Sequence, residues 1–143
     1  HDAGESVDYR VDCGDAAVGI LTDTGFVPEP AAAALTGVDL LVLESNHDVE
    51  WLRSGPYPYS LKQRILGQRG HLSNEDAAAF ARRMAECGTR CIVLAHLSRE
   101  NNTPQRALAV METALSGLDV TVEVAPRGEL SACYGAEVAL CRK

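Results

Sequence analysis

Four short segments of the chain carry side chains that bind metals or move protons, and each stands at a turn or a strand end. The segments are Thr-Asp-Thr-Gly at residues 22–25, Glu-Ser-Asn-His-Asp at 44–48, Gly-His-Leu-Ser at 70–73 and Ala-His-Leu-Ser at 95–98. Carboxylates and imidazoles are the ligands that zinc and manganese take in hydrolytic sites. A pair of metals about 3.5–4 Å apart generates a nucleophile from water and clamps a phosphate. The set predicts a metal-dependent hydrolase.

Each of these residues also has an ordinary structural explanation. Asp23 precedes Thr-Gly and could cap backbone amides in a turn, and His96 could be a hydrogen-bonded histidine at the edge of the core. His47 and His71 could each cap the helix that follows. Their joint occurrence favours the metal site, because open α/β sheets place their sites beyond the carboxyl ends of the strands.

The hydrophobic pattern predicts the elements that position these side chains. Strands are expected at residues 7–13, 17–21, 38–43, 90–97, 120–124 and 137–141, and helices at 28–35, 49–53, 61–66, from a Ser73 cap to Gly88, and from Thr103 onward. The first two strands form a hairpin, and 38–43 is typical of a strand buried on both faces. This alternation predicts one α/β domain with a mixed sheet and flanking helices. One cleft could then collect Asp23, Glu44 and His96.

Composition narrows the class of protein. A chain of 143 residues suggests one domain, and no apolar stretch approaches the roughly 20 residues that span a membrane, so we expect no membrane anchor. The start lacks a secretory leader. Five cysteines without a Cys-x-x-Cys pair favour reduced thiols and a cytoplasmic location. The net charge of −7 disfavours bulk attraction of nucleic acid.

The segment between Trp51 and His71 departs from that acidic balance. It contains four basic residues and no acidic one, together with the aromatic residues Tyr57 and Tyr59. The basic residues are Arg53, Lys62, Arg64 and Arg69. Such a segment can bind phosphates and stack on bases, although a solvated loop explains the composition equally well. We expect these four residues, together with Ser98 beside His96, to bind substrate.

Taken together, five motifs resemble the YycJ/WalJ-type branch of the metallo-β-lactamase fold hydrolases. They are Thr-Asp-Thr-Gly at 22–25, Leu-Glu-Ser-Asn-His-Asp at 43–48, Gly-Pro-Tyr-Pro-Tyr-Ser-Leu-Lys-Gln-Arg-Ile-Leu-Gly at 55–67, Gly-His-Leu-Ser-Asn-Glu-Asp-Ala-Ala at 70–78 and Leu-Ala-His-Leu-Ser-Arg-Glu-Asn-Asn at 94–102. Five motifs in order are far more specific than any single one. The resemblance implies a four-layer αββα sandwich with two divalent metal ions, zinc or manganese, at the edge between its sheets.

The resemblance also implies a role for each residue of the metal site. His1 is a ligand to one metal, Asp23 bridges both metals, and His96 completes the other. His71 lies near the scissile phosphate and Glu44 pairs with it. We group His47, which is particular to this branch, with these two as a third catalytic residue.

The chain departs from the family in one large respect. The His-x-His-x-Asp-His ligand motif of the family is absent, so residues 1–143 look like a single partial domain, the C-terminal half of the fold. We expect a complete enzyme that hydrolyses phosphodiesters with nucleic acid as substrate, most simply as a DNA exonuclease. We expect the fragment alone to be inactive and to expose a sheet face through which copies could associate.

Two other functions fit the same residues. The fold hosts many chemistries, so the chain could belong to a metallo-hydrolase of a small-molecule ester, thioester or lactam. It could also be a non-catalytic metal-binding module in which an incomplete site is intended. The basic, tyrosine-bearing segment favours the nucleic-acid substrate over the small ester.

Overall fold

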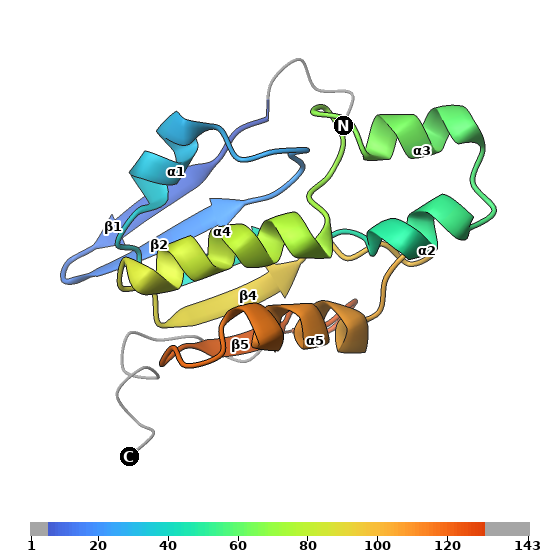
Figure 1. Cartoon of the computed structure of the whole chain (residues 1–143). Coiled ribbons are helices and arrows are strands. Elements are labelled where there is room, and N and C mark those ends of the chain that lie inside the picture. Colours follow the sequence, from blue (N-terminus) through green and yellow to red (C-terminus); the bar gives the residue numbers. More distant parts are fainter. Residues whose placement is uncertain (1–5, 131–143) are drawn as a thin grey trace.

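The computed structural model describes residues 6–130, which form a mixed sheet whose five strands lie in chain order (Figure 1). The strands are β1 (Tyr9–Cys13), β2 (Ala16–Leu21), β3 (Leu40–Glu44), β4 (Cys91–Ala95) and β5 (Thr121–Val124). β1 and β2 form an antiparallel hairpin, and every later pairing is parallel. The hairpin and the mixed sheet are therefore confirmed. The strand expected at 137–141 lies outside the described residues.

Five helices connect the strands, each near its expected position. They are α1 (Glu29–Leu35), α2 (Val49–Ser54), α3 (Tyr59–Ile65), α4 (Asn74–Glu86) and α5 (Pro104–Ala114). Ser73 caps α4 as expected, because its hydroxyl accepts a hydrogen bond from the Asp76 amide and donates one to the Asp76 carboxylate. Thr103 caps α5, because its hydroxyl accepts a hydrogen bond from the Arg106 amide. Among the described residues, every helix is too short or too polar to cross a membrane.

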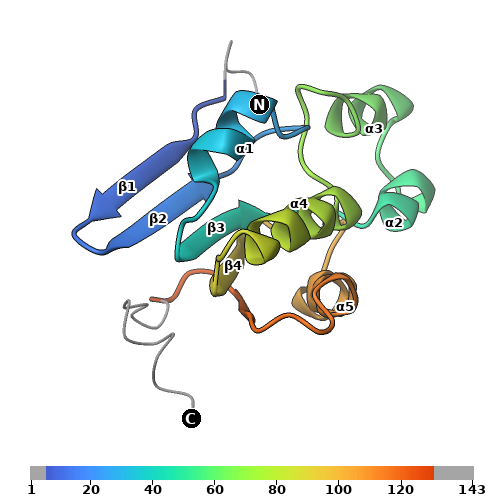
Figure 2. The ribbon, with the colours of Figure 1, turned by 60° about the vertical axis from the view of Figure 1, so that its left-hand side comes forward.

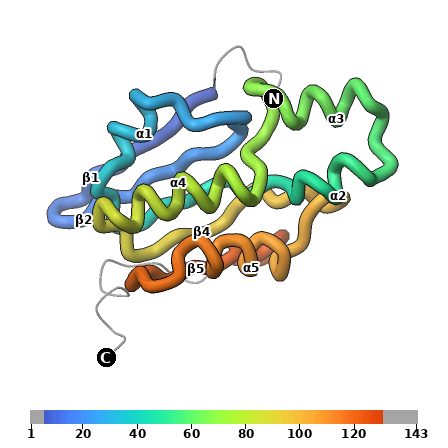
Figure 3. Tube along the Cα trace, viewed as in Figure 1, coloured from blue at the N-terminus to red at the C-terminus, as the bar shows by residue number. Residues whose placement is uncertain are grey.

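The core lies between one face of the sheet and the helices α1, α4 and α5, which pack on that face (Figure 2). The fully buried side chains come from alternate strand positions and from the inward stripes of the helices. They include Leu41, Leu43, Ile92 and Leu94 from the sheet and Leu35, Met84 and Met111 from the helices, and the buried Phe80 and Leu115 belong to the same core. α2 and α3 extend past the carboxyl ends of the parallel strands and cover neither face (Figure 3).

The second face of the sheet carries apolar side chains across β2 and β3 and is only partly buried there. In β3, Leu40 and Val42 are partly exposed while Leu41 and Leu43 are buried, so the expectation that this strand is buried on both faces is wrong. The reason is that helices α1, α4 and α5 cover a single face. Val18 of β2 is in register with Leu40, and Ile20 is in register with Val42, which extends the apolar surface across the sheet.

Candidate metal centre

The carboxyl ends of β2, β3 and β4 meet at one edge of the sheet, because these strands are parallel neighbours. Asp23 follows β2, Glu44 ends β3 and His96 follows β4, while the connection between α3 and α4 brings His71 to the same place. Each of Asp23, His71 and His96 offers a donor atom, and these atoms lie within 4.8 Å of one another. The structure thus brings together four of the residues singled out in the sequence.

Glu44 is the hub of this cluster. Its side chain is completely buried, and its Oε1 lies 2.7 Å from Nδ1 of His71 and 2.7 Å from Nδ1 of His96. Its Oε2 accepts hydrogen bonds from the backbone amides of Thr24 (3.1 Å) and Leu72 (3.3 Å). One carboxylate therefore joins the loops that carry Asp23, His71 and His96. The sequence predicted its pairing with His71, and the pairing with His96 is new.

This arrangement selects the ring nitrogen that can bind a metal. Burial raises the pKa of Glu44, but the hydrogen bonds from His71 and His96 outweigh it and lower that pKa below its usual value. The hydrogen bond to Glu44 in turn raises the pKa of His96, against the opposing effect of burial. Because an ionised carboxylate accepts from Nδ1–H, the lone pair of each neutral ring resides on Nε2.

The donor set fits a divalent metal ion. One aspartate carboxylate and two imidazoles match the nitrogen and oxygen ligands of catalytic zinc sites, which usually take three protein ligands and keep an open position. His96 Nε2 lies 3.7 Å from Asp23 Oδ1, and the side chains of both residues are close to half exposed. His1, the remaining ligand that the resemblance implies, lies outside the described residues.

The backbone is strained at two of the three donor residues. Among residues 6–130, Asp23 (φ 59°) and His96 (φ 56°) are the two non-glycine residues with positive φ, a conformation that costs about 1–2 kcal/mol. A side chain from another segment holds each of their carbonyl groups. The Ser6 hydroxyl donates to the Asp23 carbonyl (2.6 Å), and the Asn46 amide donates to the His96 carbonyl (2.8 Å).

Neither of these two clamps was identified from the sequence. The sequence could have indicated a role for Asn46, because this residue lies inside the Glu-Ser-Asn-His-Asp motif. Nothing in the sequence indicated a role for Ser6.

Gly25 fixes the spacing between two of the site loops. A Cβ atom at this position would lie 2.1 Å from the carbonyl oxygen of Gly67, far inside contact distance. The loop after β2 therefore packs backbone to backbone against the connection between α3 and α4. Asp23 and His71 are held together by this contact as well as by Glu44.

His47 lies in the interior rather than in the open site. It is 1% exposed, and neither ring nitrogen has a hydrogen-bond partner within residues 6–130. Burial, followed by the charge of His71, lowers the pKa of His47 from its usual 6.5 to about 4, so the ring is neutral near pH 7. Its carbonyl accepts from the Asn74 amide at the start of α4 (2.9 Å). This placement supports packing behind the site more than contact with substrate.

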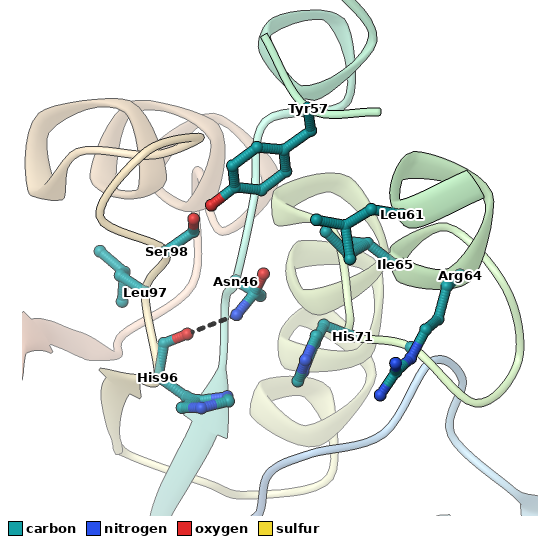
Figure 4. A pocket seen from close by; sticks show the side chains of 10 residues that line it. Asn46, Tyr57, Leu61, Arg64, Ile65, His71, His96, Leu97 and Ser98 are labelled. Atoms are coloured by element: carbon teal, nitrogen blue, oxygen red, sulfur yellow. Dashed lines mark hydrogen bonds between the residues drawn. The ribbon is translucent and has the colours of Figure 1, made fainter. Parts of the chain in front are cut away.

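A cavity of about 490 Å³ opens beside His71 and His96 (Figure 4). Of the residues expected to bind substrate, Arg64 and Ser98 line it. Lys62 instead donates from Nζ to the carbonyls of Arg53 (2.6 Å) and Gly55 (2.7 Å). The Arg53 guanidinium pairs with Glu50 (3.0 Å), and Arg69 is exposed outside this lining.

The fold defines the class of protein. The crystal structure described as the metallo-beta-lactamase fold protein YhfI from Bacillus subtilis matches with a TM-score of 0.56 and 18% identity, covering 84% of this chain and 41% of that one. This likeness confirms the expected α/β metallo-β-lactamase-type fold. Hydrolases of this fold generally use divalent metals, in agreement with the donor cluster.

Sequence comparison identifies the branch. The chain is 44% identical over 124 residues to the exodeoxyribonuclease WalJ of Streptococcus pneumoniae serotype 2, covering 87% of this chain and 46% of the relative. It is 43% identical over 107 residues to the exodeoxyribonuclease YycJ of Bacillus anthracis, covering 75% and 40%. No family model matches. The chain belongs to the YycJ/WalJ-type metallo-β-lactamase fold proteins and spans about half the length of these curated relatives.

We expect Asn46→Ala to weaken divalent metal binding by the full-length protein about tenfold, because the His96 carbonyl loses the amide that holds its backbone. Metal titration by calorimetry measures the change. Thr113→Ala is the matched control, since Thr113 on α5 also donates one hydrogen bond to a backbone carbonyl, that of Ala109 (2.8 Å). Equal affinities in wild-type and Asn46→Ala protein would show that this clamp does not support the ligand.

We expect His47→Leu to flatten the pH dependence of stability between pH 6.5 and 4. The pKa of His47 is depressed in the folded state, so between these pH values the unfolded chain binds a proton that the folded chain does not, and the free energy of unfolding decreases as the pH is lowered from 6.5 to 4. Urea unfolding of wild type and variant at several pH values, with a chelator present throughout, measures the slope. Identical slopes would contradict the assignment of a neutral, buried ring.

Proposed function

We propose that this chain carries one side of the metal centre of a metal-dependent phosphodiester hydrolase, a DNA exonuclease. The observation that carries the proposal is the Asp23, His71 and His96 donor cluster, organised by a buried Glu44. The names of the relatives support the choice of substrate, because both are called exodeoxyribonucleases. The cavity beside the cluster would give the substrate access.

In this proposal Asp23, His1 and His96 would be ligands to two zinc or manganese ions in the complete enzyme. The bound metals would supply Lewis acidity and lower the pKa of a water molecule. Glu44 orients the His96 ring through Nδ1 and keeps Nε2 directed to the metal side. Within residues 6–130, His71 lies close enough to Asp23 and His96 to be a third metal donor. In the complete centre we assign His71 to contact with the substrate phosphate instead.

We assign contact with the substrate to residues that line the cavity. The Arg64 guanidinium would stabilise the charge of a phosphate, and the Ser98 hydroxyl would donate a hydrogen bond to it. Lys62 acts instead through the loop that it holds, while the Arg53 side chain pairs with Glu50 within α2. We assign His47 a supporting role, because its ring is buried and its carbonyl accepts from the Asn74 amide at the start of α4.

We further propose that the partly exposed face of the sheet is the inner layer of the sandwich. A partner half bearing the His-x-His-x-Asp-His motif would cover Val18, Ile20, Leu40 and Val42. An isolated chain would leave this apolar surface in water, which favours association between copies.

The proposal is tested by digestion of end-labelled DNA with the full-length protein. We expect hydrolysis that requires a divalent metal and that falls at least 100-fold in Asp23→Asn, because the amide removes a ligand charge at little cost in shape. Asp15→Asn, at an exposed turn of the β1–β2 hairpin, is the matched control and should keep full activity. A wild-type protein that cleaves small esters but no DNA would refute the proposal.

The isolated chain offers a separate test. We expect calorimetric titration with zinc or manganese to show weak binding, and we expect no hydrolysis of DNA, because with His71 assigned to the phosphate neither metal keeps three protein ligands in this half of the fold. Asp23→Asn should remove the remaining heat of binding. Two tight sites in this chain would contradict the assignment of a half-domain.

A further inference from the structure

We propose that the cavity beside the metal centre is a nucleoside subsite, in which the base of the nucleotide next to the scissile phosphate stacks on Tyr57. This inference rests on the proposed function, because it places a nucleotide at the same centre. It goes further in assigning base recognition to a residue outside the metal-binding motifs.

The walls of the cavity come from two separate parts of the chain. Tyr57, Leu61 and Ile65 come from α3 and the segment before it, whereas Ser98 comes from the loop after β4. His71 and His96 lie at the metal end (Figure 4). In this view the Tyr57 hydroxyl is directed toward Ser98, so the phenol ring forms the far wall. The volume of about 490 Å³ falls within the range of roughly 300–1,000 Å³ of small-ligand sites.

The chemistry of the lining fits a nucleotide. An aromatic ring beside the aliphatic side chains of Leu61 and Ile65 provides a flat apolar surface for a base. Arg64 on the same wall suits a phosphate, since a guanidinium forms paired hydrogen bonds with its oxygens. A base and a phosphate at opposite ends of one cavity match a single nucleotide, whereas a small acyl ester would need neither group.

Tyr57 is the aromatic residue of this segment that is placed for stacking. The face of the Trp51 ring is already covered by the Arg106 guanidinium, whose central carbon lies 4.5 Å from the centroid of the ring. Arg106 is held there by an ion pair with Asp48 (2.6 Å). Tyr59 is 77% exposed and lies outside the cavity lining. Tyr57 is partly buried and contributes directly to the wall.

The loop that carries Tyr57 is held in place by neighbouring residues of the chain. Pro56 and Pro58 flank the residue and restrict the backbone on both sides. The Lys62 ammonium ties this loop to α3 through its hydrogen bonds to the Arg53 and Gly55 carbonyls. A preorganised ring loses little entropy on binding, so stacking can contribute to affinity.

The test is a comparison of a nucleotide with a sugar phosphate that lacks the base. Calorimetry on the full-length protein with metal present would measure the affinities for thymidine 5′-phosphate and for 2-deoxyribose 5-phosphate. We expect the wild type to bind the nucleotide at least tenfold more tightly. In Tyr57→Ala the two affinities should agree within about twofold, with binding of the base-free sugar phosphate unchanged as evidence of an intact site.

Two matched variants sharpen the result. Tyr57→Phe should keep the preference for the nucleotide, because it retains the ring, and Tyr59→Ala should keep it because that ring lies outside the cavity. A wild type that binds both ligands equally, or a Tyr57→Ala variant that still prefers the nucleotide, overturns the subsite. DNA hydrolysis without base preference would leave the proposed function standing and refute the subsite. A preference for the nucleotide in a protein that does not hydrolyse DNA would support the subsite and refute the proposed function.

Discussion

The hydrogen bonds of the Glu44 carboxylate are the constraint on which the rest of the site depends. A buried ionised carboxylate is costly unless its oxygens are satisfied, and here two imidazoles and two backbone amides satisfy them. These four donors come from three loops that are distant in the chain. The requirement to satisfy one charge therefore pulls the metal donors into a single cluster, and the strained backbone at Asp23 and His96 is tolerated as a consequence.

Much of the fold could be predicted from local signals. The Ser73 and Thr103 caps, the alternation of strand and helix, and the hairpin turn at Gly14 all act within a few residues, so the order of the elements is readable. The exposure of Leu40 and Val42 was not readable, because an apolar run looks the same whether one face or both are covered. Which face is covered depends on helices far away in the sequence.

The metal centre likewise has features that the sequence predicted and features that it could not predict. Strand ends predicted that Asp23, Glu44 and His96 would meet, since parallel neighbours must place their ends together. The partners of Lys62 were not predictable, because backbone carbonyls leave no mark on the residue types around them. The positive φ values of Asp23 and His96 could not be predicted from the sequence, for a related reason. Asp and His tolerate that conformation but adopt it here through clamps supplied by other segments.

The order of the strands has a consequence for how this protein is made. Because β1 to β5 pair strictly in chain order, each new strand finds its neighbour already in place. A ribosome releasing the chain from its amino end would add these five strands to one growing edge. The metal donors would then arrive one loop at a time, and the centre could close only after β4 had left the ribosome.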